Sequence, residues 1–395
     1  MNHLAYRFIF SLLCLYLPII CLSQKVKQPP EKSVWKNIDS LRIAEIEMGK
    51  SKFTPFIAPS YTPEMKFLFS AGGLFTFTND KKNPLLTRSS IPFSVGISSN
   101  GSFQLSVRAN LYSKGDKVRQ VGEFWIKDMP DNYWGVGYSN GRNREQDRNT
   151  TGYHRLWWRF YDKIIYQYKT NYFVGVAVDL NKTEASDLNP LMEDDPFILR
   201  DGTEIRNSGI GGVFQFDSRD LAVNAYKGML LDVSFIIYGG LLGGENHFQV
   251  LEIDYRQYKK VSPLRRVLAW QVKAKTTFSK APWTELAQLG SPFDLRGYYW
   301  GRYRDESMLF GLLEYRHMFQ RKTPNKQGKL ESRSGFAAWT GLGAVGQEFY
   351  NLRGKWLPNI GVGYRLEVQP RMNLRIDFGL GVKSNALYFS FNEAF

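Results

Sequence analysis

The stretch RMNLRIDFGLGV, Arg371 to Val382, alternates between apolar and polar or small residues at every step. In an extended chain successive side chains point to opposite faces, so this stretch predicts a β-strand with two different faces. One face carries the charges of Arg375 and Asp377. The other face carries a continuous apolar stripe made of Met372, Leu374, Ile376, Phe378, Leu380 and Val382.

The same alternation recurs along the chain after residue 50, as in NIGVGYRLEVQ (359–369), MLLDVSFII (229–237) and LAWQVKAKTTF (268–278). The segments are about ten residues long, which is the length that a tilted strand needs to cross a bilayer. Aromatic residues such as Trp157 and Trp158 gather near segment ends, as they do at membrane interfaces. The pattern predicts an all-β protein, a transmembrane antiparallel β-barrel. A soluble, exported β-sandwich with one wet face is the alternative.

About sixteen strands can be counted, an even number that suits a single-chain bacterial barrel. The expected strands lie near 53–61, 66–78, 91–99, 102–113, 117–128, 153–167, 171–181, 208–218, 229–239, 247–258, 266–279, 307–319, 335–347, 357–369, 371–382 and 386–395. Long connections after the fifth, seventh and eleventh strands (129–152, 182–207, 280–306) fall on one rim. Short turns prevail on the other rim, which is the arrangement of outer-membrane barrels.

The first residues predict an export signal, because Arg7 precedes an apolar run over 8–20 and a small residue, Ser23. Both cysteines of the chain, Cys14 and Cys21, lie inside this segment. The exported protein would then have no thiol for a disulfide, a metal site or nucleophilic catalysis. We expect three parts, listed by residue: a signal peptide at 1–23, a periplasmic tether or plug at 24–50, and an outer-membrane β-barrel at 51–395.

The net charge of +15 does not indicate a nucleic-acid partner. The basic residues are spread along strands and loops, whereas a nucleic-acid site gathers them on one helix, face or tail. Arginines and lysines that line a lumen or face anionic outer-membrane lipid fit this distribution better.

No motif indicates enzyme chemistry, so we expect no catalytic residue, no cofactor and no metal. A G-x-G-x-x-G pattern at Gly341, Gly343 and Gly346 lies inside a predicted strand, with no helix after it to bind a dinucleotide. Its small residues instead indicate a place where a loop or a strand bend approaches closely. The histidines of the exported chain are far apart in sequence, without the spacing of metal ligands. No pair of carboxylates is placed for acid–base catalysis.

The eleventh connection contains SPFDLRGYYWGRYRDESM, Ser291 to Met308, which is rich in aromatic residues and arginines. On a surface loop its rings would form a large exposed apolar patch. A loop that folds into the lumen would bury these rings and would then need carboxylate partners for Arg296. Candidate partners on the charged faces of the following strands are Glu314, Glu367 and Asp377. We therefore predict an infolded loop between strands 11 and 12, held by a buried ion pair.

Several stretches resemble the BamA/TamA superfamily of outer-membrane assembly and translocation barrels (the bacterial surface antigen family). LRGY at Leu295–Tyr298, followed by LLEYR in the next strand, is similar to the family's Arg-Gly-aromatic tip on the sixth extracellular loop. The family's Asp-x-Arg-Asp turn and the strand after it are similar to residues 216–235, FDSRDLAVNAYKGMLLDVSF. The family's last strands are similar to residues 361–379, GVGYRLEVQPRMNLRIDFG, and to the terminal FSFNEAF.

The resemblance implies a barrel whose first and last strands meet at a weak seam. It also implies a loop-lock motif at the tip of the infolded loop, made of Leu295, Arg296, Gly297 and Tyr298. A C-terminal insertion signal would comprise Phe389, Phe391 and Phe395. The thirteenth strand, FAAWTGLG (336–343), lacks the acid that the family often carries there, so Glu314 or Asp377 would have to serve. Residues 24–50 contain no recognisable periplasmic client-capture domain.

By this resemblance we expect the protein in the cell outer membrane, where it would insert other proteins or translocate them. Its partners would be client outer-membrane or surface proteins and a separate periplasmic protein. Two alternatives stay open. A pore for small, anionic solutes would use a basic lumen, with Lys273, Lys275, Arg365 and Arg375. A surface-exposed structural or adhesive barrel would act through the loops at 129–152 and 182–207.

Overall fold

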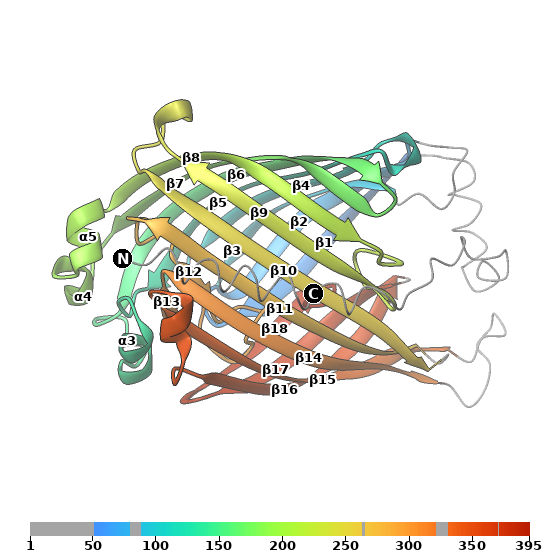
Figure 1. The fold of residues 1–395 in the computed structure, drawn as a ribbon. Coiled ribbons are helices and arrows are strands. Elements are labelled where there is room, and N and C mark those ends of the chain that lie inside the picture. The colour runs from blue at the N-terminus through green and yellow to red at the C-terminus, as the bar shows by residue number, and fades with distance from the viewer. Residues whose placement is uncertain (1–50, 80–87, 263–264, 321–330, 370) are drawn as a thin grey trace. The chain divides into compact units, whose positions relative to one another are not determined.

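The computed structural model describes residues 51–79, 88–262, 265–320, 331–369 and 371–395. In this part of the chain sixteen antiparallel strands form one closed barrel (Figure 1). The strands are β1 (Lys52–Thr62), β2 (Lys66–Phe77), β3 (Ser89–Ser98), β4 (Phe103–Tyr112), β5 (Val118–Asn132), β6 (Gly152–Lys169), β7 (Tyr172–Ser186), β8 (Glu204–Asp217), β9 (Gly228–Tyr238), β10 (Phe248–Ser262), β11 (Arg266–Ser279), β14 (Ser307–Gln320), β15 (Glu331–Gly346), β16 (Leu357–Gln369), β17 (Met372–Gly381) and β18 (Ser384–Phe391). The predicted fold class and strand number are confirmed.

The barrel strands follow the chain order, with β11 paired directly to β14. Between them β12 (Ala287–Leu289) and β13 (Tyr303–Asp305) form a separate two-stranded sheet. The predicted infolded connection is therefore the one between the eleventh and twelfth barrel strands. We call residues 280–306 the lumen loop.

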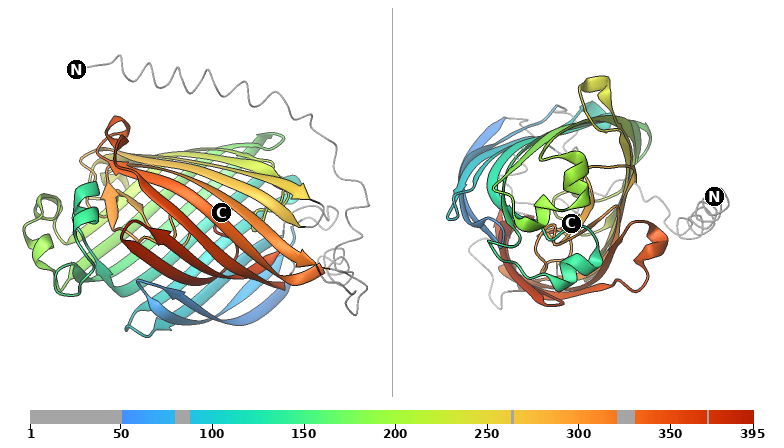
Figure 2. Two further views of the ribbon diagram at one scale, coloured as in Figure 1. Left: turned by 90° about the horizontal axis from the view of Figure 1, so that it is seen from below. Right: turned by 90° about the vertical axis from the view of Figure 1, so that its left-hand side faces the viewer.

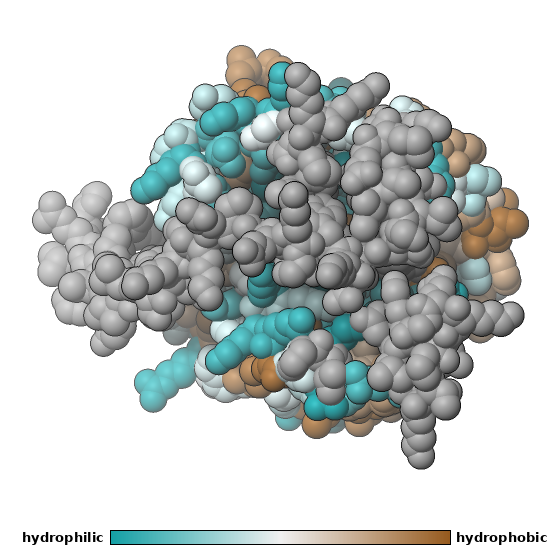
Figure 3. Space-filling view, turned by 90° about the vertical axis from the view of Figure 1, so that its right-hand side faces the viewer, coloured by the Kyte–Doolittle hydropathy of each residue, from teal (hydrophilic) through white to brown (hydrophobic). Residues whose placement is uncertain are grey.

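The two faces of the strands are those that the alternation predicts. On β17 the side chains of Ile376 and Phe378 are 39% and 43% exposed on the outside, whereas Arg375 and Asp377 are fully buried on the inside. An outward apolar band of this kind suits contact with lipid tails. Viewed from the end with the short turns, hydrophobic residues are seen at the top, along the right-hand side and at the lower edge of the barrel (Figure 3).

The last strand is shorter than predicted. We expected a strand over 386–395, but β18 ends at Phe391. Asn392 adopts a left-handed conformation, with φ of 65°, which asparagine tolerates better than most residues. The chain turns inward there, and the side chains of Glu393 and Phe395 are buried. We call residues 392–395 the C-terminal tail.

The long loops cover one mouth of the barrel. The short helices α3 (Tyr138–Asn143), α4 (Pro190–Glu193) and α5 (Pro196–Asp201) lie across this mouth (Figure 2, right). An apolar cluster ties these loops to the lumen loop. Its buried members are Tyr133, Tyr153, Met192, Ile198, Ile205 and Trp283.

The expected signal peptide at 1–23 and the expected tether or plug at 24–50 lie outside the described residues. Within the described ranges, no helix is both long enough and apolar enough to span a bilayer.

Candidate functional site

The lumen loop is organised locally around Asp294. The carboxylate of Asp294 accepts hydrogen bonds from the backbone N–H groups of Gly290 and Ser291, at 3.0 and 2.7 Å, and from the hydroxyl of Ser291. Burial raises the pKa of the Asp294 carboxyl, although these hydrogen bonds act in the opposite direction. The short turn that results presents Leu295 and Arg296 to the barrel wall.

Arg296 lies fully buried between two carboxylates of the wall. Its guanidinium contacts Glu314 on β14 and lies 2.7 Å from Asp377 on β17. The same group stacks over the ring of Trp339 on β15, 3.5 Å from the ring centroid. A buried arginine is costly unless it is paired with good geometry, and here two carboxylates and an aromatic face compensate the lost water.

These groups belong to a closed ring of alternating charge, which we call the arginine–carboxylate ring. The order around it is Arg296, Glu314, Arg316, Glu393, Arg365, Asp377 and back to Arg296. Apart from the short Arg296–Glu314 contact, its nitrogen–oxygen distances run from 2.5 to 3.7 Å. The ring joins the lumen loop, three strands of the wall and the C-terminal tail in one network.

A further arginine, Arg375, attaches to this ring from β17. It lies 3.0 Å from Asp377 and donates to the backbone carbonyl of Pro292 in the lumen loop, at 2.9 Å. Asp377 is thus shared by three arginines. Removing any one of them leaves the carboxylate with partners.

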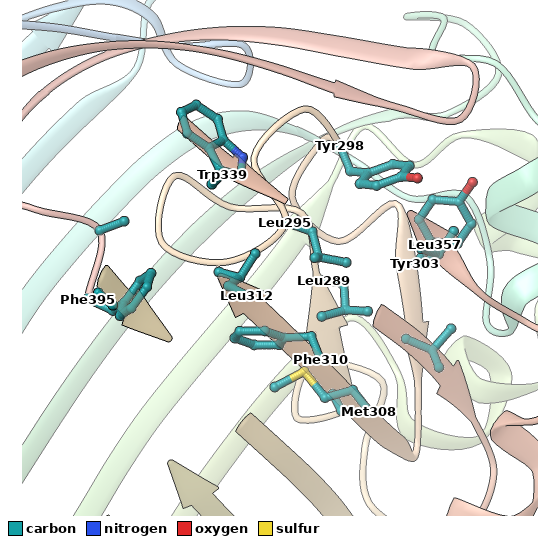
Figure 4. Packing of buried hydrophobic residues seen from close by; sticks show 14 of the residues in the cluster. Leu289, Leu295, Tyr298, Tyr303, Met308, Phe310, Leu312, Trp339, Leu357 and Phe395 are labelled. Atoms are coloured by element: carbon teal, nitrogen blue, oxygen red, sulfur yellow. The ribbon is translucent and has the colours of Figure 1, made fainter. Parts of the chain in front are cut away.

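The rest of the loop tip is fixed by packing and by hydrogen bonds to the wall. Leu295 packs among Leu289, Leu312 and other buried side chains (Figure 4). Gly297, with φ of 122°, donates its N–H to the hydroxyl of Tyr388 on β18, at 3.1 Å. The hydroxyl of Tyr298 donates to the carbonyl of Pro358 at the start of β16, at 2.7 Å.

The wall makes room for the tip through glycines on β15 and β17. A Cβ on Gly379 would collide with the backbone carbonyl of Arg296, and one on Gly381 would collide with the ring of Tyr298. On β15, Cβ atoms at Gly341 and Gly343 would meet the side chain of Leu295. The G-x-G-x-x-G pattern thus lies in a strand, where its first two glycines accommodate the loop.

A sequence signal for this groove was present. Three neighbouring strands each carry a G-x-G pair, at 341–343, 361–363 and 379–381. The first and third pairs face the loop, whereas the side chains of Trp339 and Asp377 take the space at the second. Paired glycines leave a furrow on a strand, because glycine has no side chain to fill the space.

One predicted partner of Arg296 lies elsewhere. Glu314 and Asp377 both contact Arg296, but Glu367 pairs with Arg265, at 2.7 Å. Asp377 is opposite Gly363 on β16, and Glu367 lies four residues farther along that strand. At about 3.3 Å per residue, Glu367 is about 13 Å closer to the short-turn rim, beyond the reach of the loop. The prediction of Glu367 as a partner was wrong.

The aromatic residues of the expected insertion signal fall into two groups. Phe389 and Phe391 lie on β18 and are half-buried. Phe395 is inside the barrel, where its ring lies 5.1 Å from the guanidinium of Arg316 and 6.3 Å from the ring of Tyr258. A role of these residues in insertion stays a prediction.

Beside this site lies the seam where the barrel closes. β1 and β18, which lie wholly within the described residues, share a single register pair, Tyr61 with Phe389. In contrast β1 pairs with β2 through eleven residues, and β17 with β18 through eight. The seam is therefore the weakest junction of the closed barrel.

The lumen loop touches both sides of the seam. On the β18 side, Tyr388 accepts from Gly297, and Ser384 donates to the carbonyl of Gly297, at 2.6 Å. On the β1 side, the N–H of Trp300 donates to the carboxylate of Glu64, in the β1–β2 turn, at 2.9 Å. Burial raises the pKa of the Glu64 carboxyl.

In the described ranges, no group of three or more histidine, cysteine, aspartate or glutamate side chains could hold a metal ion. The arrangement holds a loop and a chain end in place, and its chemistry is electrostatic pairing.

A closed sixteen-stranded barrel with an outward apolar band, a charged lumen and an infolded loop has the architecture of an outer-membrane β-barrel. The chain belongs to the Omp85 superfamily, whose domain matches residues 89–395. This confirms the resemblance found in the sequence and places the protein in the bacterial outer membrane.

Among solved structures the chain is similar to BamA from Haemophilus ducreyi lacking POTRA domains 1–3, with 12% identity and a TM-score of 0.55 over 87% of this chain and 70% of that one. It is also similar to CdiB from Acinetobacter baumannii, with 13% identity and a TM-score of 0.52 over 87% of this chain and 60% of that one. For CdiB from Escherichia coli the identity is 10% and the TM-score is 0.51, over 89% of this chain and 70% of that one. These similarities concern the fold. No curated protein matches the sequence.

Proposed function

We propose that this barrel takes part in inserting proteins into the outer membrane or in translocating them across it, together with a separate periplasmic partner. Membership of the Omp85 superfamily supports a role of this general kind. The barrel would act by offering a site for incoming chains, without covalent chemistry.

The observation that carries the proposal is the seam. A barrel normally satisfies every backbone N–H and C=O group by pairing all its strands, because lipid offers no hydrogen bonds. Here the first and last strands share one register pair, Tyr61 with Phe389. An edge that lacks a partner is expensive in lipid and acts as a template for another strand. Exchange of the weak seam for pairing with a client strand is therefore favoured.

The lumen loop would serve as the lock that keeps the rest of the wall intact while the seam opens. Arg296 links the loop to β14 and β17 through Glu314 and Asp377. With this loop in place, strain at the seam is confined to β1 and β18. We propose the loop-lock role for Leu295, Arg296, Gly297 and Tyr298 on this basis.

The alternatives from the sequence have less support. Two of the four basic residues invoked for an anion pore, Arg365 and Arg375, are buried in salt bridges with Asp377, and Lys273 pairs with Glu252 at 2.8 Å. The long loops invoked for adhesion use several apolar side chains to pack against each other and against Trp283 of the lumen loop.

The proposal is tested by quantitative proteomics of the outer membrane after depletion of the protein. We expect several other barrels or surface proteins to decrease together. Arg296→Ala, expressed in place of the wild type, should fail to restore them. Arg256→Ala is the matched control, since it removes a lumen arginine paired with Asp254 of its own strand. An unchanged outer-membrane proteome, with altered uptake of anionic solutes, would favour the pore instead.

A further inference from the structure

A cavity of about 310 Å³ lies among the loops at the covered mouth of the barrel. Four connections contribute to its lining, and two of them carry the helices α3 and α5 that lie across this mouth (Figure 2, right). Among the lining residues are Tyr138 and Ser139 of α3, Phe197 of α5, Asp305 of β13, and Gln347 and Lys355 between β15 and β16. The side chains of Ser139 and Gln347 are exposed, so the cavity opens to solvent. Its size suits a small molecule.

Asp305 presents a buried carboxylate to this cavity. The residue is 4% exposed, and its Oδ1 accepts a hydrogen bond from the N–H of Glu306, at 2.9 Å. Its backbone is fixed on one side by register pairing with Ala287, and on the other the N–H of Gly137 donates to the carbonyl of Arg304, at 2.8 Å. A Cβ on Gly137 would lie 3.8 Å from Oδ2 of Asp305. Because glycine stands there, no side chain covers this oxygen from that side.

Within the described ranges, no arginine, lysine or histidine forms an ion pair with Asp305. Two buried arginines of the same segment, Arg302 and Arg304, donate to backbone carbonyls, at 2.8 and 3.0 Å, and not to this carboxylate. The carboxylates of the lumen differ, since Glu314 and Asp377 are each paired with arginines. A buried carboxylate is costly unless a cation compensates the lost water. The missing cation therefore indicates a place for a ligand.

Lys355 supplies the opposite charge from a different loop. It is half-buried and lines the same cavity, and in the part of the chain that the structure describes no carboxylate pairs with it. Burial raises the pKa of the Asp305 carboxyl, and the nearby charge of Lys355 acts in the opposite direction. The cavity thus offers one negative and one positive group that are too far apart to pair with each other. The half-buried rings of Tyr138 and Phe197 lie beside them, and an aromatic face also attracts an ammonium group.

We propose that this cavity binds a small zwitterion, a molecule that carries an ammonium group and an acidic group on a compact apolar frame. Asp305 binds the ammonium group, Lys355 binds the acidic group, and the apolar part packs against Tyr138 and Phe197. A free amino acid has this chemistry, and so does the phosphoethanolamine headgroup of a lipid. The site lies at the outer mouth and does not depend on the proposed function.

The test uses the full chain folded in detergent micelles and measures affinity by isothermal titration calorimetry. The probes are L-phenylalanine and phosphoethanolamine. Phenethylamine and hydrocinnamate are the controls, because they are phenylalanine without its carboxylate and without its ammonium group. We expect L-phenylalanine to bind at least about tenfold more tightly than either control, since each control loses one charge-assisted hydrogen bond. Tighter binding of phosphoethanolamine than of L-phenylalanine would support the site and identify a lipid headgroup as the source of the ligand.

The two charged residues are tested separately. Asp305→Asn and Lys355→Met should each weaken binding of the zwitterions by about tenfold or more. Asp305→Asn should not lower the midpoint temperature of heat-modifiable migration on gels, because it removes a buried charge that has no cationic partner. Asp194→Asn and Lys280→Met are the matched controls, since both residues are exposed in loops of the same mouth and lie outside the cavity lining. They should bind like the wild type.

Equal affinities for L-phenylalanine and phenethylamine would overturn the proposal, because Lys355 would then bind no acidic group. So would the absence of binding of both zwitterions at millimolar concentration. This comparison of probes uses the wild type alone, so it decides even if a variant does not fold. An Asp305→Asn variant that folds and binds like the wild type would also contradict the site. A lower gel midpoint for this variant would show that Asp305 serves the fold, and would count against a ligand.

Discussion

On one side of β18 all eight of its residues pair with β17, whereas on the other side only Phe389 pairs with β1. The well-paired side is reinforced from within by the lumen loop and the arginine–carboxylate ring. The poorly paired side faces an edge that carries Pro55 and Pro59. β18 is therefore firmly paired with β17 and only weakly paired with β1.

The comparison shows that the two sides depend on different parts of the chain. The stable wall depends on side chains, since a few buried charges and paired glycines hold the loop against β14 to β18. The seam depends on the backbone, where Pro55 and Pro59 of β1 have no N–H group to donate. Changes to ring residues should therefore weaken the wall, whereas the seam should respond to changes at its prolines and its turn.

The largest expected effect is that of Arg296→Ala. It removes two charge-assisted hydrogen bonds, one to Glu314 and one to Asp377, each of about 1.5 to 3 kcal/mol, from carboxylates that keep other arginine partners. The midpoint temperature of heat-modifiable migration on gels should fall, with greater protease sensitivity of the lumen loop. Arg256→Ala should change the midpoint much less. A variant with wild-type migration and protease resistance would show that the loop is not held by this arginine.

The second effect comes from the groove that receives the loop. Gly379→Ala places a methyl group against the carbonyl of Arg296, and we expect a loss of about 2 to 3 kcal/mol from overpacking. Gly212→Ala on β8 is the matched control, because a Cβ there has no neighbour within 4 Å. The same gel midpoint measures both. Equal midpoints for the two variants would mean that the loop tip does not rest on β17.

A smaller effect is expected for Glu393→Gln, which removes the charge that Arg365 and Arg316 share in the tail. The amide oxygen still accepts a hydrogen bond, so the cost should be about 1.5 kcal/mol. A local readout is digestion with carboxypeptidase, which should remove Phe395 faster from the variant than from the wild type. Glu252→Gln, at a salt bridge on β10, should leave this digestion unchanged. If both variants digest like the wild type, the ring does not retain the tail.

Much of the fold could be predicted from the sequence, because the alternation of apolar and polar residues is a local signal. It located each strand to within a few residues and indicated which face of β17 carries Arg375 and Asp377. The end of β18 was missed for a physical reason. FSFNEAF continues the alternation to Phe395, but burial of Glu393 between two arginines outweighs the local preference.

The site was predictable only in part. Arg296 required buried carboxylates, and this requirement indicated Glu314 and Asp377 correctly. It also suggested Glu367, because facing the lumen does not specify the height along the barrel. That height depends on the register between strands, which one sequence does not contain. Arg316, Arg365 and Glu393 were missed as ring members for the same reason, since they meet only after β14, β16 and the tail are aligned.

The smallest expected effect concerns pH and the turn on the weak side of the seam. Burial raises the pKa of Glu64 above its usual value of 4.5, so the folded barrel holds this proton more tightly than the unfolded chain does. Stability must then fall as the pH rises from about that value through the raised pKa, because the folded state binds more protons in that window. Glu64→Gln keeps the acceptor for the N–H of Trp300 and removes the ionisation. The midpoint temperature of gel migration should therefore decrease for the wild type, relative to the Glu64→Gln variant, as the pH rises. A difference in midpoint that does not change with pH would mean that ionisation of Glu64 does not destabilise the folded barrel.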